Sequence, residues 1–132
     1  MRFYIVNSNS FQLSFRHELG KSPLMYASGA WFRYTNIDGR NEKHIGDGRP
    51  QLVKFLLYHG ANIDTRDKIG RTSLMHASEI RNVEIMRILL ESGADIDARD
   101  KRGKTVLSAL NPDWKRNLKE VTMLLEKYGA KE

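Results

Sequence analysis

The chain contains no cysteine and only three prolines and two tryptophans in 132 residues. Without thiols it forms neither disulfides nor thiolate metal sites, which fits a reducing compartment. No apolar run approaches the roughly 18 residues that a membrane span needs. Residues 1–6 carry a single positive charge and too short an apolar stretch for a signal-peptide core. These absences predict a soluble intracellular protein, and we expect it in the cytoplasm.

Charged residues are plentiful and slightly one-sided. The 22 Lys and Arg residues exceed the 16 Asp and Glu residues, which leaves a net charge of +6. A positive balance favours acidic partners and non-specific contact with polyanions, but it does not indicate a fold. A chain of this length is one domain's worth and can bury a core without disulfides or metals.

An internal repeat is the strongest signal. Residues 60–77 and 93–110 are identical at ten of eighteen positions with an offset of 33 residues, where unrelated sequences match at roughly one position. A weaker third copy begins at Gly20, since residues 20–27 parallel residues 70–77. A period of this size is typical of repeat proteins whose units stack.

Each copy carries the signals of a short helix, a turn and a second helix. A hydroxyl or amide side chain suits the residue before a helix, and glycine suits the residue after it. Pro23 and Pro50 stand at first helical positions, where proline is tolerated. We predict first-helix caps at Ser22, Thr72 and Thr105, second helices that begin at Pro50, Val83 and Leu118, N-caps at Asn82 and Asn117, and terminal glycines at Gly60, Gly93 and Gly129.

These residues resemble the ankyrin repeat, whose pattern is D-x-x-G-x-T-P-L-H-x-A-A followed by a helix that ends in L-L-x-x-G-A. The middle copy matches the pattern at Asp67, Gly70, Thr72, Leu74, Ala77, Leu89, Leu90, Gly93 and Ala94. The resemblance covers roughly residues 14–132 and implies an all-α solenoid of about three repeats. Its helix-turn-helix pairs would be joined by β-hairpin-like loops.

The resemblance divides one domain, residues 1–132, into four parts. They are an amino-terminal cap (1–13), a first repeat with an inserted loop (14–64, loop 30–49), a second repeat (65–97) and a carboxy-terminal capping repeat (98–132). Phe11, Leu13 and Phe15 alternate with polar residues, which indicates an extended segment with one buried face. The cap interpretation competes with a frayed chain end.

Two departures from the pattern predict modest stability. The histidine that follows the leucine is replaced by Met25, Met75 and Ser108, so we expect its usual hydrogen bond to the threonine to be lost. The glycine between the helices is Arg81 in the middle copy. That position favours positive φ, which costs a non-glycine residue about 1 kcal/mol.

The first repeat has 17 extra residues between its helices. Insertions of this length are usually functional or disordered. Trp31, Phe32 and Tyr34 could extend the first helix, anchor a partner, or pack locally and hold the loop down. Several glycines predict flexibility in the rest of the insertion.

Basic residues recur in the turns between the units and form the candidate binding surface. By resemblance, ankyrin repeats bind partners through these protruding fingers and through the groove lined by the first helices. The corresponding residues are Lys68, Ile69, Arg71, Glu79, Ile80, Lys101, Arg102, Lys104 and Asn111, to which the insertion adds Trp31, Phe32 and Tyr34. Exposed Ile69 and Ile80 would give the surface a mixed apolar and basic character. The alternative is a solvated edge whose cations are partly neutralised by Asp64, Asp67, Asp97 and Asp100.

Catalytic and metal chemistry find no support in the sequence. The four histidines have no metal-ligand spacing, residues 36–42 lack the ligands of a calcium loop, and no set of nucleophile, base and acid is recognisable. We therefore expect no enzyme, no cofactor and no metal. The expected function is a protein–protein interaction module whose partner has an acidic surface. Nucleic-acid binding and self-association through the aromatic insertion remain open as alternatives, with a monomer favoured.

Overall fold

The structure is a computed structural model that describes residues 20–29, 32–37, 40–45, 48–108, 110 and 117–130. Within these residues the elements are α1 (Pro23–Ala27), β1 (Phe32–Ile37), β2 (Arg40–Ile45), α2 (Pro50–Tyr58), α3 (Ser73–Glu79), α4 (Val83–Glu91) and α5 (Leu118–Lys127). None of the described helices is both long enough and apolar enough to cross a membrane. The expected amino-terminal cap, Trp31 and Asn111 lie outside the described residues.

Three of the predicted N-caps are confirmed. The side-chain oxygens of Ser22, Thr72 and Asn82 accept hydrogen bonds from backbone amides three residues later, at 3.3, 3.4 and 3.0 Å. The prediction for Asn117 is wrong, because this residue has a left-handed backbone (φ 53°) and its side chain makes no capping hydrogen bond. An N-cap needs an extended backbone to aim its side chain at the first turn. The second helices begin at the three predicted residues.

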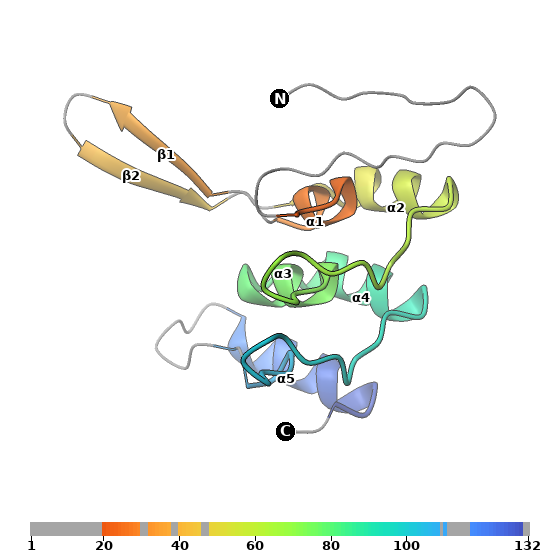
Figure 1. Cartoon of the computed structure of the whole chain (residues 1–132). Coiled ribbons are helices and arrows are strands. Elements are labelled where there is room, and N and C mark those ends of the chain that lie inside the picture. The colour runs from red at the N-terminus through yellow and green to blue at the C-terminus, as the bar shows by residue number, and fades with distance from the viewer. Residues whose placement is uncertain are drawn as a thin grey trace.

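The helices form a stack of units, in which the first helices of the units make one layer and the second helices make another. Figure 1 shows α1 and α2 above α3 and α4, with α5 on the far side of α4. The first layer, α1 and α3, contributes Leu24, Leu74 and Met75 to the core. The second layer, α2, α4 and α5, contributes Val53, Leu56, Ile85, Met86, Leu89, Val121, Leu124 and Leu125. Each helix pair buries its apolar face against its neighbours, so the helical part is the all-α solenoid that the sequence predicts.

The first helix of the last unit is not seen within the described residues. Thr105 and Ser108 make the reciprocal bonds of a helix start: the Thr105 amide donates to Ser108 Oγ (2.7 Å), and the Ser108 amide donates to Thr105 Oγ1 (3.3 Å). Residues 106–108 nevertheless form a turn rather than a helix, and residues 109 and 111–116 lie outside the described part.

The insertion contains a β-hairpin, which the sequence interpretation missed. β1 and β2 pair in antiparallel register from Phe32 with Ile45 to Ile37 with Arg40. Figure 1 shows the hairpin projecting away from the helices. A helical extension through Phe32 and Tyr34 is therefore wrong, because both residues lie in a strand. The available signal was the dipeptide Asp38-Gly39, which favours a two-residue hairpin turn and follows a segment with aromatic and β-branched residues at 32–37.

The same backbone hydrogen bond closes the link between the two helices in the first and second units. The Arg49 amide donates to the Ala27 carbonyl at 2.8 Å, and the Asn82 amide donates to the Ala77 carbonyl at 3.1 Å in the second pair. The same backbone hydrogen bond thus closes both links, although Arg49 follows Ala27 by 22 positions and Asn82 follows Ala77 by five. Gly48 (φ 76°) takes the place that Arg81 (φ 55°) occupies, and the expected positive φ of Arg81 is confirmed.

Candidate functional site

Two protruding turns share one construction, and we name them the Asp67 finger (residues 67–71) and the Asp100 finger (residues 100–104). In the Asp67 finger, the Asp67 amide donates a hydrogen bond to the Arg71 carbonyl at 3.0 Å, and the Gly70 amide donates to the Asp67 carbonyl at 3.0 Å. In the Asp100 finger the equivalent bonds measure 3.0 and 2.9 Å. Aspartate suits this position because its short side chain reaches the amides of its own turn. The central residues of each turn are left exposed at the tip.

The carboxylates close the fingers. Asp67 Oδ1 accepts from the amides of Ile69 (3.1 Å) and Arg71 (2.8 Å). Asp100 Oδ1 accepts in the same way from the amides of Arg102 (2.8 Å) and Lys104 (3.0 Å). Each aspartate therefore uses one oxygen to hold its turn rather than to neutralise a neighbouring cation.

The two fingers are bonded to each other. The Lys101 amide donates to the Ile69 carbonyl at 3.0 Å, and Arg66 Nη1 donates to the Arg99 carbonyl at 2.6 Å. Gly70 is required at this approach, since its φ is 81° and a Cβ there would lie 2.9 Å from the Lys101 nitrogen. The fingers thus hold Ile69 and Lys101 next to each other on one backbone frame.

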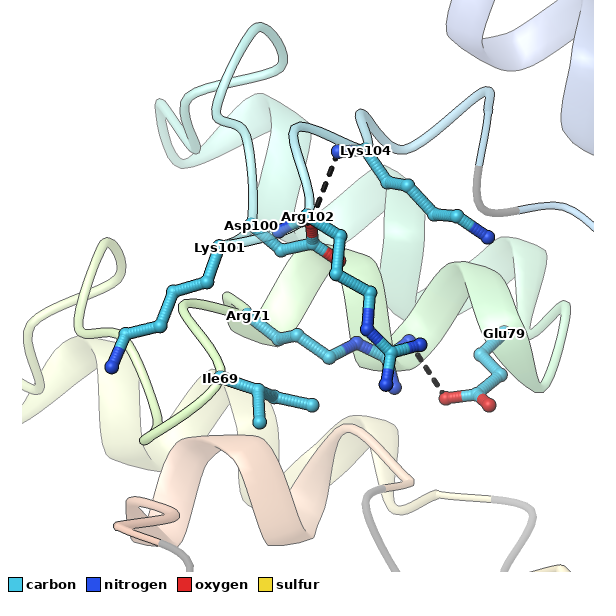
Figure 2. Close-up of a pocket in the computed structure, with 7 residues that line it drawn as sticks. All are labelled: Ile69, Arg71, Glu79, Asp100, Lys101, Arg102 and Lys104. Atoms are coloured by element: carbon cyan, nitrogen blue, oxygen red, sulfur yellow. Dashed lines mark hydrogen bonds and ion pairs between the residues drawn. The ribbon is translucent and has the colours of Figure 1, made fainter.

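A pocket opens between the fingers and the end of α3. Its lining consists of Ile69, Arg71, Glu79, Asp100, Lys101, Arg102 and Lys104, which Figure 2 draws as sticks. Six of these were candidate site residues, and the structure brings them together. The sequence predicts Asp100 as a neutralising charge, and in the structure this residue also closes its finger and lines the pocket.

The pocket is cationic because its basic side chains outnumber its carboxylates. Its lining holds four cationic side chains and two carboxylates, a net charge of +2. Arg71 Nη2 pairs with Glu79 Oε2 at 2.8 Å, with 16% and 36% of the two side chains exposed. Among the described residues, no ion pair reaches Lys101, Arg102 or Lys104.

The acids expected to neutralise this edge are largely engaged elsewhere. Asp64 Oδ1 accepts from the Asp95 amide at 3.0 Å, and Asp67 and Asp100 accept from the amides of their own fingers. Backbone donors, rather than side-chain cations, occupy these carboxylates. Their negative charges still offset part of the positive charge of this edge, so the interpretation of a partly neutralised edge stays a prediction.

Several candidate residues lie elsewhere. Ile80 is only 8% exposed, so the expectation of an exposed Ile80 is wrong, whereas Ile69 is 48% exposed as expected. The chain reverses at Arg81 directly after Ile80, which places Ile80 in the tight link to α4 rather than on the groove wall. Lys68 lies against Gly20 of the preceding turn and does not line the pocket. Trp31 and Asn111 lie outside the described residues, and Phe32 and Tyr34 are placed only as part of β1.

Beneath the Asp67 finger lies a buried pair that sequence reasoning missed. His76 Nε2 lies 3.0 Å from Asp67 Oδ2, and the two side chains are 2% and 1% exposed. Met75 stands where the family pattern has its histidine. His76, one position later, makes a hydrogen bond to Asp67 that joins α3 to the Asp67 finger. The only sequence signal was that His76 aligns with Ala109, where the two copies differ.

The surroundings set the charge states of this pair. Burial lowers the pKa of His76. The hydrogen bond and the charge of Asp67 oppose this shift without cancelling it, and the charges of Arg71 and Lys21 lower the pKa further. Burial alone would raise the pKa of Asp67, but hydrogen bonds from His76 and from the Arg71 and Ile69 amides lower it overall. A neutral His76 therefore donates Nε2–H to an ionised Asp67. Its Nδ1 has no hydrogen-bond partner among the described residues.

The buried pair serves the structure of the Asp67 finger. The histidine–aspartate pair is sealed from solvent and so cannot reach a substrate. No group of three or more His, Asp or Glu side chains able to hold a metal occurs in the part of the chain that the structure describes. The pocket offers an apolar side chain beside cations that have no ion-pair partner among the described residues.

Comparison with known families agrees with the repeat architecture. A family model described as "Ankyrin repeats (3 copies)" matches residues 44–131, and a second, described as "Ankyrin repeat", matches residues 19–68. The chain belongs to the ankyrin repeat family. This confirms the resemblance noted in the sequence. Ankyrin repeats are in general protein–protein interaction modules and not enzymes.

Proposed function

We propose that this ankyrin repeat protein is a non-enzymatic binding module that captures a partner protein with an acidic surface at the pocket between its two fingers. One observation carries the proposal: Lys101, Arg102 and Lys104 stand together without an acidic partner among the described residues, beside exposed Ile69. Unpaired cations on a surface attract acidic partners and speed their association.

The rigid backbone of the fingers supports this role. Association costs free energy wherever a loop must become ordered, so a surface that is already fixed binds more tightly for the same contacts. Here each finger is closed by its aspartate, and the Lys101 amide joins the two. The partner would therefore meet a surface that needs little rearrangement.

Charge reversal at the Asp100 finger tests the proposal. A variant with Lys101→Glu, Arg102→Glu and Lys104→Glu should lose its partners. The matched control reverses three exposed cations on the second helices, with Lys54→Glu, Arg87→Glu and Lys119→Glu, and changes the net charge equally. Proteins captured from an extract of the source cell would be quantified, and the affinities of those that depend on the finger measured by titration. If both variants retain the same proteins with the same affinities, the pocket is not the binding surface.

Two other outcomes would point to the other functions that the sequence left open. Binding to nucleic acid would show a steep loss of affinity with salt and little sequence preference. Glu79 and Ile69 in the pocket make it a poor match for a polyphosphate backbone. Self-association through the insertion would appear as concentration-dependent mass in sedimentation, abolished by replacing Trp31, Phe32 and Tyr34 with serine.

A further inference from the structure

We infer that the pocket takes a short acidic segment with one bulky apolar side chain between its carboxylates, and that Glu79 limits its affinity by occupying Arg71. The inference rests on the proposed function and specifies the chemistry of the partner. It draws on three observations: the position of Ile69 among the cations, the Arg71–Glu79 pair, and the bonded fingers.

The apolar requirement comes from Ile69. This side chain is 48% exposed at the tip of the Asp67 finger, and its carbonyl accepts from the Lys101 amide. In Figure 2 the side chains of Lys101 and Lys104 extend to opposite sides of the pocket. An extended segment advances about 3.3 Å per residue with alternating side chains. A residue seated on Ile69 therefore places acidic neighbours on both sides within reach of cations.

The role of Glu79 follows from its pairing. Figure 2 shows Arg71 and Arg102 pointing into the same pocket, and one of its dashed lines joins Arg71 to Glu79, at 2.8 Å. An incoming carboxylate finds Arg102 without an ion-pair partner among the described residues, but it must compete with Glu79 for Arg71. Glu79 also repels any anion that enters. A doubly charged phosphate is repelled more strongly by Glu79 but is also attracted more strongly by the cations, so charge alone does not separate the two ligands. We assign the ligand to acidic residues around an apolar one because Ile69 is exposed among the cations.

Synthetic peptides provide the probe. Three fluorescein-labelled heptapeptides share a frame of six acidic residues, Glu-Asp-Glu before and Glu-Asp-Glu after a central residue that is leucine, serine or phosphoserine. Fluorescence polarisation with the full chain should show the leucine peptide binding at least about threefold tighter than the other two, the scale of one partly buried apolar contact. In the ¹⁵N NMR spectrum its addition should shift the amides of Ile69, Arg71, Lys101 and Arg102.

Substitutions then assign each contact. Ile69→Ser should remove the difference between the leucine and serine peptides without abolishing binding. Glu79→Gln should tighten binding of the leucine peptide about threefold to fivefold, as expected for the loss of one exposed charge interaction. The matched control, Glu91→Gln on α4, removes the same charge from an exposed position outside the pocket and should change the affinity by less than about twofold. Circular dichroism of each variant checks that the helices are retained.

The possible failures are distinguishable. If the leucine and serine peptides bind equally, or if Glu79→Gln has no more effect than Glu91→Gln, the inference is wrong while the acidic-partner function stands. Tightest binding by the phosphoserine peptide would overturn the assignment to carboxylates. If the triple charge reversal at Lys101, Arg102 and Lys104 leaves the binding of every peptide unchanged, the proposed function fails as well.

Discussion

At the scale of single residues, Asp67 and Asp100 are equivalent in sequence but not in structure. Each uses Oδ1 to hold two amides of its finger. Asp67 also uses Oδ2 to accept from His76 inside the protein, whereas the chain has Ala109 at the corresponding position of the last unit. The Asp67 finger is therefore anchored to α3, and it carries the Ile69 and Arg71 side of the pocket.

Acid should weaken the fold through His76. Because burial holds the folded pKa of His76 below its ordinary 6.5, the unfolded chain binds a proton at this residue before the folded chain does. The free energy of unfolding is therefore fully present above about pH 6.5 and falls as the pH drops toward the folded pKa. The lowered pKa of Asp67 adds a further loss only below its ordinary 3.8. Urea denaturation between about pH 5 and 8 measures the effect of His76.

Two glutamine variants isolate this contribution. His76→Gln keeps an N–H donor and does not titrate, so the decline between about pH 7 and 5 should become shallower. His59→Gln, at a half-buried position at the end of α2, serves as the matched control and should preserve the decline. An identical pH dependence in the wild type and in His76→Gln would show that another group is responsible.

At the scale of elements, the insertion is an addition to a repeat that is otherwise complete. The Ala27–Arg49 bond closes the link between α1 and α2 as the Ala77–Asn82 bond closes that between α3 and α4. Gly48 at the junction must stay, since its φ is positive and a Cβ there would collide with Ile85 Cδ1. The β1–β2 hairpin pairs with itself and projects from the stack (Figure 1). The stack therefore does not depend on it for closure.

Removing the hairpin should leave the solenoid folded. Replacing residues 29–47 by the dipeptide Glu-Ile, copied from Glu79 and Ile80, restores the five-residue spacing of the second pair and retains Gly48. A shorter loop costs less entropy to close, so the free energy of unfolding should stay the same or rise by about 1 kcal/mol. Urea denaturation measures this. A loss of about 2 kcal/mol or more would mean that the hairpin packs on the helices and contributes to the core.

At the scale of the whole molecule, stability is shared along the stack. One core cluster contains residues from all the described helices, and the central α4 packs against α2, α3 and α5. Leu89 on α4 is fully buried at the middle of this arrangement, and Leu125 is equally buried on α5. A defect in a central unit of a solenoid disturbs two interfaces, whereas a defect in a terminal unit disturbs one.

Truncating the central leucine should destabilise the entire chain. Leu89→Ala removes a buried side chain and should cost about 2–5 kcal/mol, measured by urea or thermal denaturation. Met123→Ala on α5, where the side chain is 59% exposed, is the surface control and should change stability by no more than about 0.5 kcal/mol.

Leu125→Ala should first raise hydrogen exchange in α5. Equal exchange in all helices of that variant would argue against unit-by-unit stability.

The helical fold was largely predictable because its signals are local. A cap at Ser22, Thr72 or Asn82 depends on a side chain that reaches an amide three residues away. The stacking of the units is predicted by the 33-residue period of the sequence. The hairpin was equally local, but its Asp38-Gly39 signal was overlooked. Asn117 failed because its backbone conformation, not its residue type, decides whether it can cap.

By itself the sequence determined the repeat, the starts of the second helices and the chemical types of the residues at the finger tips. Only the tertiary structure decided which of those residues share a pocket. Ile69 and Lys101 meet through a bond between neighbouring fingers, Ile80 is buried at a chain reversal, and His76 reaches Asp67 across nine residues. The physical reason is that exposure and charge pairing depend on which surfaces the stacked units turn toward one another, and a single unit does not contain that information.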